Sequence, residues 1–276
     1  MRKERVELSD LLSYGFMQRA LIAGSFIACA CSVLGLFLVL RRLSLIGDGL
    51  SHVAFGSVAL SMLLQAHTLL VTIPVVLLAS AGIFRLTQKT RLYGDAAIGI
   101  VSSFGIAGGV LIASMAGGFN IDLFSYLFGN ILAVSSQEVV ISCVLCFIVL
   151  ATVALFFRDL FAITFDEETA RTSGVRTEAI TMLLVLLTGL TVVLAMKVVG
   201  IMLISALLIV PAAASLQVAR SFLRAILLSA AFGVSSVLTG IVLSFFLNLP
   251  AGATIVIVNL CMFALTASIR LLKRDA

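Results

Sequence analysis

The stretch "AITMLLVLLTGLTVVLAM", residues 179–196, contains no charged side chain. A second run, "AILLSAAFGVSSVLTGIVLSFFL" at 225–247, is longer and also uncharged. A helix needs about 20 such residues to cross the hydrocarbon core of a bilayer, whereas a barrel strand needs only about half that number. The two runs therefore predict an all-α fold, a polytopic bundle of transmembrane helices.

The composition of the whole chain supports this prediction. Of its 276 residues, 62% are hydrophobic and 11% are charged, and the mean hydropathy is +1.25. Soluble domains are about half apolar and about a quarter charged. The net charge of +5 indicates basic loops that face the anionic lipid of the cytoplasmic leaflet, and no nucleic-acid partner.

Nine segments approach the length of a membrane span. We therefore expect eight to nine spans, with nine favoured. They belong to one transmembrane domain that covers residues 1–276 and begins with an N-terminal tail at 1–18. The segments are 20–40, 46–64, 69–86, 96–115, 139–158, 178–196, 198–217, 225–247 and 252–270.

The distribution of Lys and Arg predicts the orientation of a multi-pass protein in a bacterial cell membrane, because positively charged loops stay cytoplasmic. Thirteen of the 18 basic residues then lie inside: Arg41, Arg42, Arg85, Lys89, Arg91, Arg158, Arg171, Arg176, Arg220, Arg224, Arg270, Lys273 and Arg274. The N-terminal tail does not follow this rule, because its basic residues fall on the predicted outer side. Either the tail is an interfacial helix on that side, or the count of nine spans is wrong by one.

The segment "NIDLFSYLFGNILAVSSQE", residues 120–138, is only half apolar and contains Asp122, Asn130 and Glu138. Lipid-exposed backbone must satisfy its own hydrogen bonds, so such a segment fits a short re-entrant or interfacial helix better than a tenth span.

Asp48 and His52 stand out in the apolar stretch "LIGDGLSHVAFGSVAL", residues 45–60. Residues four apart share one helix face, and a charge within the bilayer costs about 2.5–3.5 kcal/mol, which suggests a function. A carboxylate oxygen and an imidazole nitrogen are suitable ligands for zinc or manganese. Two alternatives remain, a proton relay, or an N-cap at Asp48 with His52 hydrogen-bonded inside the protein.

Small residues surround this pair. Gly47, Gly49 and Gly56 flank it, and "GIVSSFGIAGG" at 99–109 contains pairs of small residues four positions apart. Such residues let helices approach closely or let carbonyl groups face a pathway, and for 99–109 we expect helix packing.

The longest polar insert contains "FDEETARTSGVRTEA", residues 165–179. Acidic residues at 166–168 favour a first helical turn, and Gly174 favours a C-terminal cap. We predict a short cytoplasmic helix suited to docking on a soluble partner, with a solvated loop as the alternative. The sequence has no G-x-x-x-x-G-K-[ST] and no H-E-x-x-H, so we expect a transport subunit rather than an enzyme, with ATP hydrolysis on a separate chain.

Three stretches together resemble the permeases of bacterial zinc and manganese ABC importers. They are "RRLSLIGDGLSHVAFGSVAL" (41–60), "DEETARTSGV" (166–175) and "KVVGIMLISALLIVPAAAS" (197–215). The resemblance covers roughly residues 16 to 272. It implies the fold of the cobalamin and siderophore importers, with their first span absent here.

The resemblance also implies partners and site residues. Two permease chains would form the pathway, two cytoplasmic ATPase subunits would bind below, and an extracytoplasmic solute-binding protein would deliver the metal. Asp48 and His52 match the family's metal pair. The coupling segment, placed at 159–178, would contact the ATPase through residues 166 to 174, and the residues assigned to it are Asp166, Glu167, Glu168, Ala170, Arg171 and Gly174.

We expect no resident cofactor, only transported Zn²⁺ or Mn²⁺, with zinc favoured over manganese by its higher affinity for such ligands and iron also possible. One alternative is a cobalamin or iron-chelate ABC permease, for which an apolar or basic cavity would be expected instead of an Asp/His pair. The other is a secondary transporter in which Asp48 and His52 relay protons.

Overall fold

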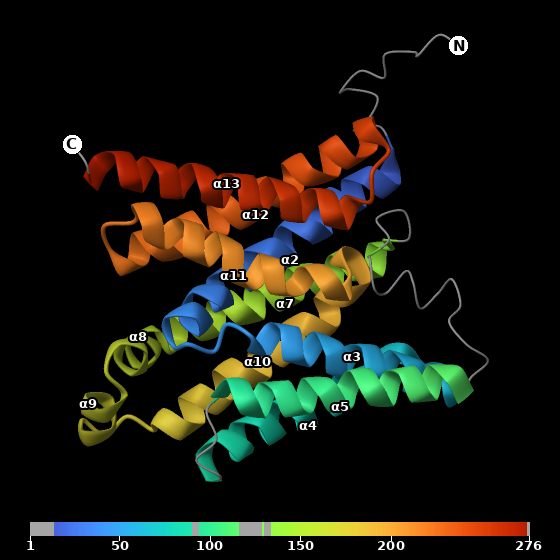
Figure 1. Ribbon diagram of the computed structural model, residues 1–276, viewed down its shortest axis with the longest axis horizontal. Coiled ribbons are helices and arrows are strands. Elements are labelled where there is room, and N and C mark those ends of the chain that lie inside the picture. Colours follow the sequence, from blue (N-terminus) through green and yellow to red (C-terminus); the bar gives the residue numbers. More distant parts are fainter. Residues whose placement is uncertain (1–13, 90–93, 116–128, 130–133, 275–276) are drawn as a thin grey trace.

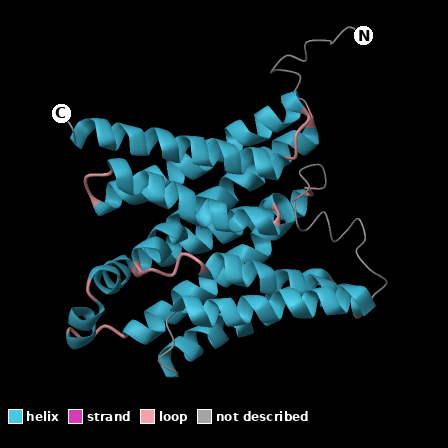
Figure 2. Ribbon diagram, in the orientation of Figure 1, coloured by secondary structure: helices cyan, strands magenta, loops and turns pink. Residues whose placement is uncertain are grey.

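The computed structural model describes residues 14–89, 94–115, 129 and 134–274. Within these ranges the chain forms helices and their connections, and no strand (Figure 2). In chain order the helices are α2 (Gly15–Leu40), α3 (Ile46–Leu63), α4 (Thr68–Lys89), α5 (Gly94–Met115), α7 (Ser136–Leu155), α8 (Phe157–Phe165), α9 (Glu167–Thr172), α10 (Thr177–Val199), α11 (Ile201–Val218), α12 (Phe222–Leu247) and α13 (Ala251–Arg274).

All nine predicted spans correspond to helices. Eight helices among the described residues are long and apolar enough to cross a membrane. The ninth, α11, contributes a shorter apolar stretch, Leu203–Val218. The prediction of an all-α bundle with eight to nine spans is therefore confirmed, and the protein is a multi-pass membrane protein.

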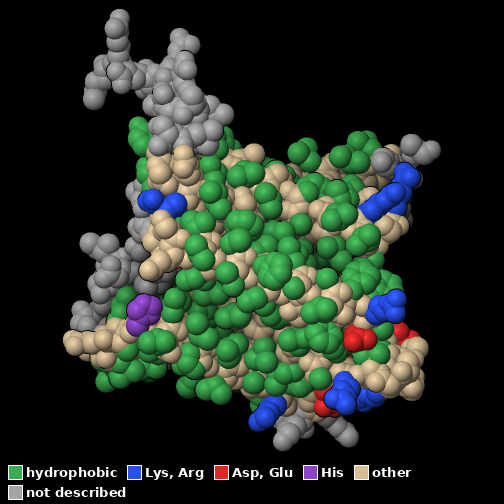
Figure 3. Space-filling view, turned by 180° about the vertical axis from the view of Figure 1, so that it is seen from behind, with side chains coloured by type: hydrophobic (Ala, Val, Ile, Leu, Met, Phe, Trp, Pro, Cys, Tyr) green, Lys and Arg blue, Asp and Glu red, His purple; other side chains and the backbone are tan. Residues whose placement is uncertain are grey.

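Successive spanning helices run in opposite directions, so their ends gather at two faces of the bundle (Figure 1). One face, which we call the basic end, carries the turn 41–45, the segment 156–176, the turn 219–221 and the C-terminal end of α13. Figure 3 shows the acidic and most of the visible basic side chains gathered there. This arrangement agrees with the predicted segregation of charge.

The first span begins earlier than predicted. α2 starts at Gly15, so Arg19 lies inside the helix and not in a tail before it. The Arg19 side chain donates a hydrogen bond from Nε to the Val134 carbonyl at 2.8 Å, which gives the charged group a polar partner near the helix end. Residues 1–13, the remainder of the predicted tail, lie outside the described residues.

Helix α2 runs through the middle of the bundle and contacts α7, α10, α11 and α12 (Figure 1). In the most apolar stretch of α2, 72% of the residues are buried, whereas in that of α13 only 17% are. Gly35 of α2 touches the backbone of Leu208 in α11 and leaves no space for a Cβ atom. Lipid is as apolar as a protein core, so close backbone packing between small residues, rather than apolar burial, holds such helices together.

Most of the predicted re-entrant segment 120–138 lies outside the described residues, including Asp122 and Asn130. Its last part begins α7, where the Ser135 hydroxyl accepts a hydrogen bond from the Glu138 backbone N–H and the Glu138 carboxylate accepts one from the Ser135 N–H. Glu138 therefore completes a capping box.

Candidate functional site

The turn between α2 and α3 places Asp48 close to the basic end. Leu45 is the N-cap of α3, without a side-chain cap, and Asp48 lies in the first turn. The alternative prediction of an N-cap at Asp48 is therefore wrong, because the helix already begins at Ile46. In the first turn a carboxylate is still stabilised by the positive end of the helix dipole.

Asp48 and His52 face each other along α3. The Asp48 Oδ2 and His52 Nε2 atoms are 3.4 Å apart, and the two side chains are 46% and 27% exposed. The predicted sharing of one helix face is confirmed. No cluster of three or more His, Cys, Asp or Glu side chains that could hold a metal occurs among the described residues. One chain thus brings together two potential ligands, whereas zinc sites usually have four.

Glycines fix the position of α3. A Cβ atom on Gly105 of α5 would lie 2.8 Å from Val53 and 2.9 Å from the carbonyl carbon of His52, and one on Gly56 would lie 2.7 Å from the Gly105 carbonyl oxygen. Gly47 and Gly49 likewise pack against Leu208 and Ile98. The predicted packing role of 99–109 is confirmed at Gly105, and it sets the backbone that carries His52.

The predicted polar helix is α9, and its two ends are closed by local hydrogen bonds. Asp166 is the N-cap and accepts a hydrogen bond from the Thr169 N–H at 3.0 Å. Hydrogen bonds from the side chain and backbone of Thr169 lower the pKa of the Asp166 carboxyl. At the other end Gly174 has φ +88°, and the N–H groups of Gly174 and Val175 bond to the carbonyls of Arg171 and Ala170. This is a Schellman motif, which needs a left-handed residue at the position of Gly174.

Arg41 connects α9 to the transmembrane helices. Its Nη2 lies 2.7 Å from Glu167 Oε2, and its Nη1 donates to Thr181 Oγ1 of α10, also at 2.7 Å. The Arg41 side chain is only 7% exposed. Burial lowers the pKa of the Arg41 guanidinium, and the Glu167 carboxylate works in the opposite direction.

Aromatic side chains hold α8 against the bundle. The rings of Phe161 and Phe165 lie 5.1 and 5.6 Å from the ring of Phe222, the first residue of α12. Edge-to-face pairs at such distances are favourable beyond their apolar area. Phe165 nevertheless remains 60% exposed, so part of its apolar surface is open at the basic end.

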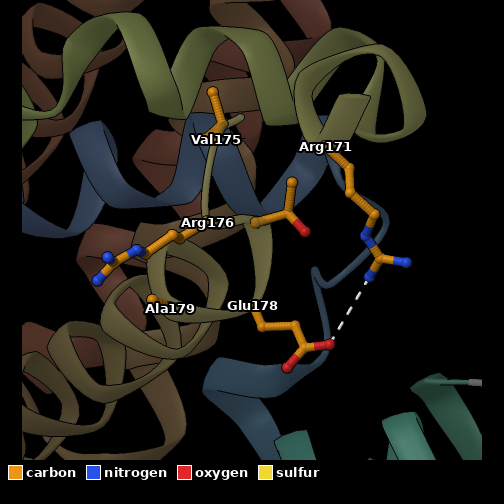
Figure 4. Close-up of a pocket in the computed structure, with 6 residues that line it drawn as sticks. Arg171, Val175, Arg176, Glu178 and Ala179 are labelled. Carbon is orange, nitrogen blue, oxygen red and sulfur yellow. Dashed lines mark ion pairs between the residues drawn. The ribbon is translucent and has the colours of Figure 1, made fainter. Parts of the chain in front are cut away.

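Two open grooves border α9 at the basic end. One, of about 450 Å³, is lined by Arg171, Val175 and the start of α10. Figure 4 shows Arg171 and Glu178 facing each other there, while Arg176 points to the opposite side. Their nearest atoms are 3.7 Å apart and both side chains are well exposed. The second groove, of about 570 Å³, extends from Val175 towards Asp159 and Leu183.

The structure thus separates the predicted residues into two sites on different helices. Asp48 and His52 form one pair on α3, and residues 166–174 form α9 together with its two caps. Glu168 and Arg171 are exposed and Ala170 is buried, whereas Glu167 turns towards Arg41. Sequence reasoning missed Arg41, which it counted only as a loop charge, because its partner lies 126 positions away.

An all-helical multi-pass bundle with a partly exposed Asp/His pair in a spanning helix, and a capped polar helix at one end, has the architecture of a membrane transport protein. The chain belongs to the ABC 3 transport family, whose model matches residues 13–270. The family that the three sequence stretches resemble is thereby confirmed, and the chain is an ABC-type metal permease.

Individual proteins agree with this assignment. The chain is 34% identical to the manganese transport system membrane protein MntC of Listeria innocua, over 93% of this chain and 91% of that one. It is 36% identical to the manganese import system permease protein ScaB of Streptococcus gordonii, over 97% of each.

Two solved structures have the same fold. PsaBC from Streptococcus pneumoniae, in complex with Fab, matches with a TM-score of 0.84 and 34% identity, over 94% of this chain and 93% of that one. A structure described as an inward-facing conformation of a putative metal-chelate type ABC transporter matches with a TM-score of 0.75 and 14% identity, over 97% of this chain and 91% of that one. The second match concerns the fold alone and supports the predicted likeness to chelate importers.

Proposed function

We propose that this chain is the permease subunit of an ATP-driven importer that carries a divalent transition metal into the cytoplasm. The observation that carries the proposal is the Asp48–His52 pair, 3.4 Å apart and partly exposed on a spanning helix. Ionisable side chains in spanning helices are rare and usually mark an ion pathway. In this proposal Asp48 and His52 bind the transported metal.

A second copy of the chain completes the metal pathway. Two ligands from each of two chains related by a two-fold axis supply four, which is the usual number for zinc. The exposure of both side chains supports this, because they remain accessible to groups from outside the chain. Whether the four ligands meet at one centre or form two sites depends on how the two copies are arranged.

Manganese is the cargo that we would test first. Both relatives named above are described as manganese transporters. The preference for zinc in the sequence analysis rested on the general order of metal affinity, which does not decide selectivity in cells. A carboxylate with an imidazole suits either ion, so zinc is the natural competitor.

The partners follow from the same proposal. The basic end faces the cytoplasm, because basic loops are retained there. Two ATPase subunits bind to it at α8 and α9, where Phe165 is exposed and the grooves beside Val175 are open. An extracytoplasmic solute-binding protein delivers metal to the opposite end. The chain itself hydrolyses no ATP in this scheme, since its sequence has no P-loop.

The test is ATP-dependent uptake of Mn²⁺ by proteoliposomes that contain the chain with its ATPase and solute-binding protein. Asp48→Asn removes the charge at constant size. Loss of even an outer-shell partner weakens metal sites by about 10–100-fold, so we expect at least this loss of uptake. Asp95→Asn is the matched control, because Asp95 is an exposed acid in the first turn of α5.

Near-normal uptake by Asp48→Asn would refute the proposed role of the pair. Metal uptake that continues without the ATPase subunits would instead point to a secondary transporter.

A further inference from the structure

Arg41 occupies a junction of three helices at the basic end. It is the C-cap residue of α2, and its guanidinium binds Glu167 in the first turn of α9 and Thr181 in α10. The Thr181 hydroxyl in turn donates a hydrogen bond to the Thr177 carbonyl at 2.8 Å. Both terminal nitrogens of the Arg41 guanidinium and the Thr181 hydroxyl therefore have hydrogen-bond partners at this junction.

A short hydrogen-bonded turn connects the junction to the start of α3. The N–H groups of Arg42 and Leu43 bond to the carbonyls of Val39 and Leu38, and the N–H of Ile46 bonds to the Leu43 carbonyl. These bonds end α2 with a Schellman motif in which Arg42, at φ +58°, takes the left-handed position usually occupied by glycine. A short turn closed by backbone hydrogen bonds thus separates Arg41 from the first turn of α3, which contains Asp48.

The two ion pairs of α9 differ in how tightly they hold it. Arg171 and Glu178 are 61% and 68% exposed and 3.7 Å apart, and such surface pairs contribute little. Arg41 is 7% exposed and 2.7 Å from Glu167. Glu167 is 41% exposed, so only the arginine of this pair is buried. Removing Glu167 leaves the buried Arg41 charge uncompensated, which is unfavourable. Arg41 therefore holds α9 more tightly than Glu178 does.

We propose that Arg41 is a positioning residue that transmits the movement of α9 to the α2–α3 turn and so to the Asp48–His52 pair. The inference rests on the proposed function, since it assumes that an ATPase moves α9. Through this link ATP hydrolysis would change the distance between Asp48 and its metal-binding partners without any direct contact between Arg41 and the metal.

The experiment measures metal ions imported per ATP hydrolysed in the reconstituted complex. Arg41→Gln and Glu167→Gln each break the pair, Arg41→Lys keeps the charge, and Arg42→Gln makes the same change at the exposed neighbouring arginine. Coupling between sites typically amounts to about 5–150-fold. We therefore expect the number of metal ions imported per ATP to decrease by a factor in this range in both glutamine variants. Arg41→Lys should recover much of it, and Arg42→Gln should match wild type.

The double variant Arg41→Gln/Glu167→Gln should be no worse than either single variant, because both remove the same link. Proportional loss of uptake and hydrolysis, or additive defects in the double variant, would show that the junction is only structural and overturn the inference. Glu167 is 41% exposed, so Glu167→Gln decides the matter if Arg41→Gln fails to assemble. Absence of ATP-driven uptake in wild type would instead refute the proposed function.

Discussion

Helices α3 and α9 both carry charged residues that the sequence singles out, yet different forces hold them in place. α3 is buried along most of its length and lies against α5 with its backbone in contact at Gly56 and Gly105. α9 has six residues, of which only Ala170 is buried. Its shape depends on Asp166 and Gly174 at its two ends.

This difference indicates a division of roles. A helix fixed by backbone contact cannot change its packing in small steps, and so it can hold ligands at a defined separation. α9 keeps its shape through hydrogen bonds at its own ends, so in the proposed coupling it moves as a unit relative to the bundle. The Arg41–Glu167 pair is the connection between the two, and each of the following variants disturbs one side of the comparison.

The largest effect is expected from breaking α9 itself. Ala170→Pro removes the hydrogen bond from the Ala170 N–H to the Asp166 carbonyl and costs about 3 kcal/mol of helix stability, whereas Ala170→Gly keeps the N–H and costs about 1 kcal/mol. We expect the proline variant to reach the membrane, with metal-stimulated ATP hydrolysis and uptake both sharply reduced, and the glycine variant to be intermediate. Wild-type uptake by an assembled Ala170→Pro complex would show that α9 does not couple the ATPase to transport.

An intermediate effect is expected from separating α3 and α5. Gly105→Val places a side chain against the backbone of Val53 and His52, and overpacking of this kind costs about 1–3 kcal/mol. Gly108→Val is the matched control, because a Cβ atom there meets no atom within 4 Å. Thermal unfolding of the purified protein in detergent measures the difference. Equal stability of the two variants would mean that this close contact does not hold α3.

The smallest effect is expected at the exposed ion pair of α9. Glu178→Gln removes the partner of Arg171, and surface pairs of this kind contribute about 0–1 kcal/mol. Uptake and thermal stability should stay close to wild type, and any difference should shrink as salt is added, because exposed charges are screened. A loss as large as that of Glu167→Gln would remove the distinction between the buried and the exposed pair.

Much of the fold could be predicted because its determinants are local. The length of an apolar run decides whether a helix can span, and the nine predicted segments reappear as helices. The spacing of Asp48 and His52 alone places them on one helix face. The C-terminal cap of α9 at Gly174 could likewise be predicted, because it acts on hydrogen bonds within a few residues of itself. Asp166, which was expected in the first turn, is instead the N-cap of the helix.

The sequence by itself determined the spanning helices, the Asp48–His52 face and the capped helix at 167–172, since each depends on residues within a few turns of one another. Only the tertiary structure decided that Arg41 meets Glu167 and Thr181, that Phe222 supports α8, and that Gly105 touches the backbone of His52. These contacts join positions far apart in the chain. They depend on how whole helices pack, and neither the charge of an arginine nor the size of a glycine specifies which partner it meets.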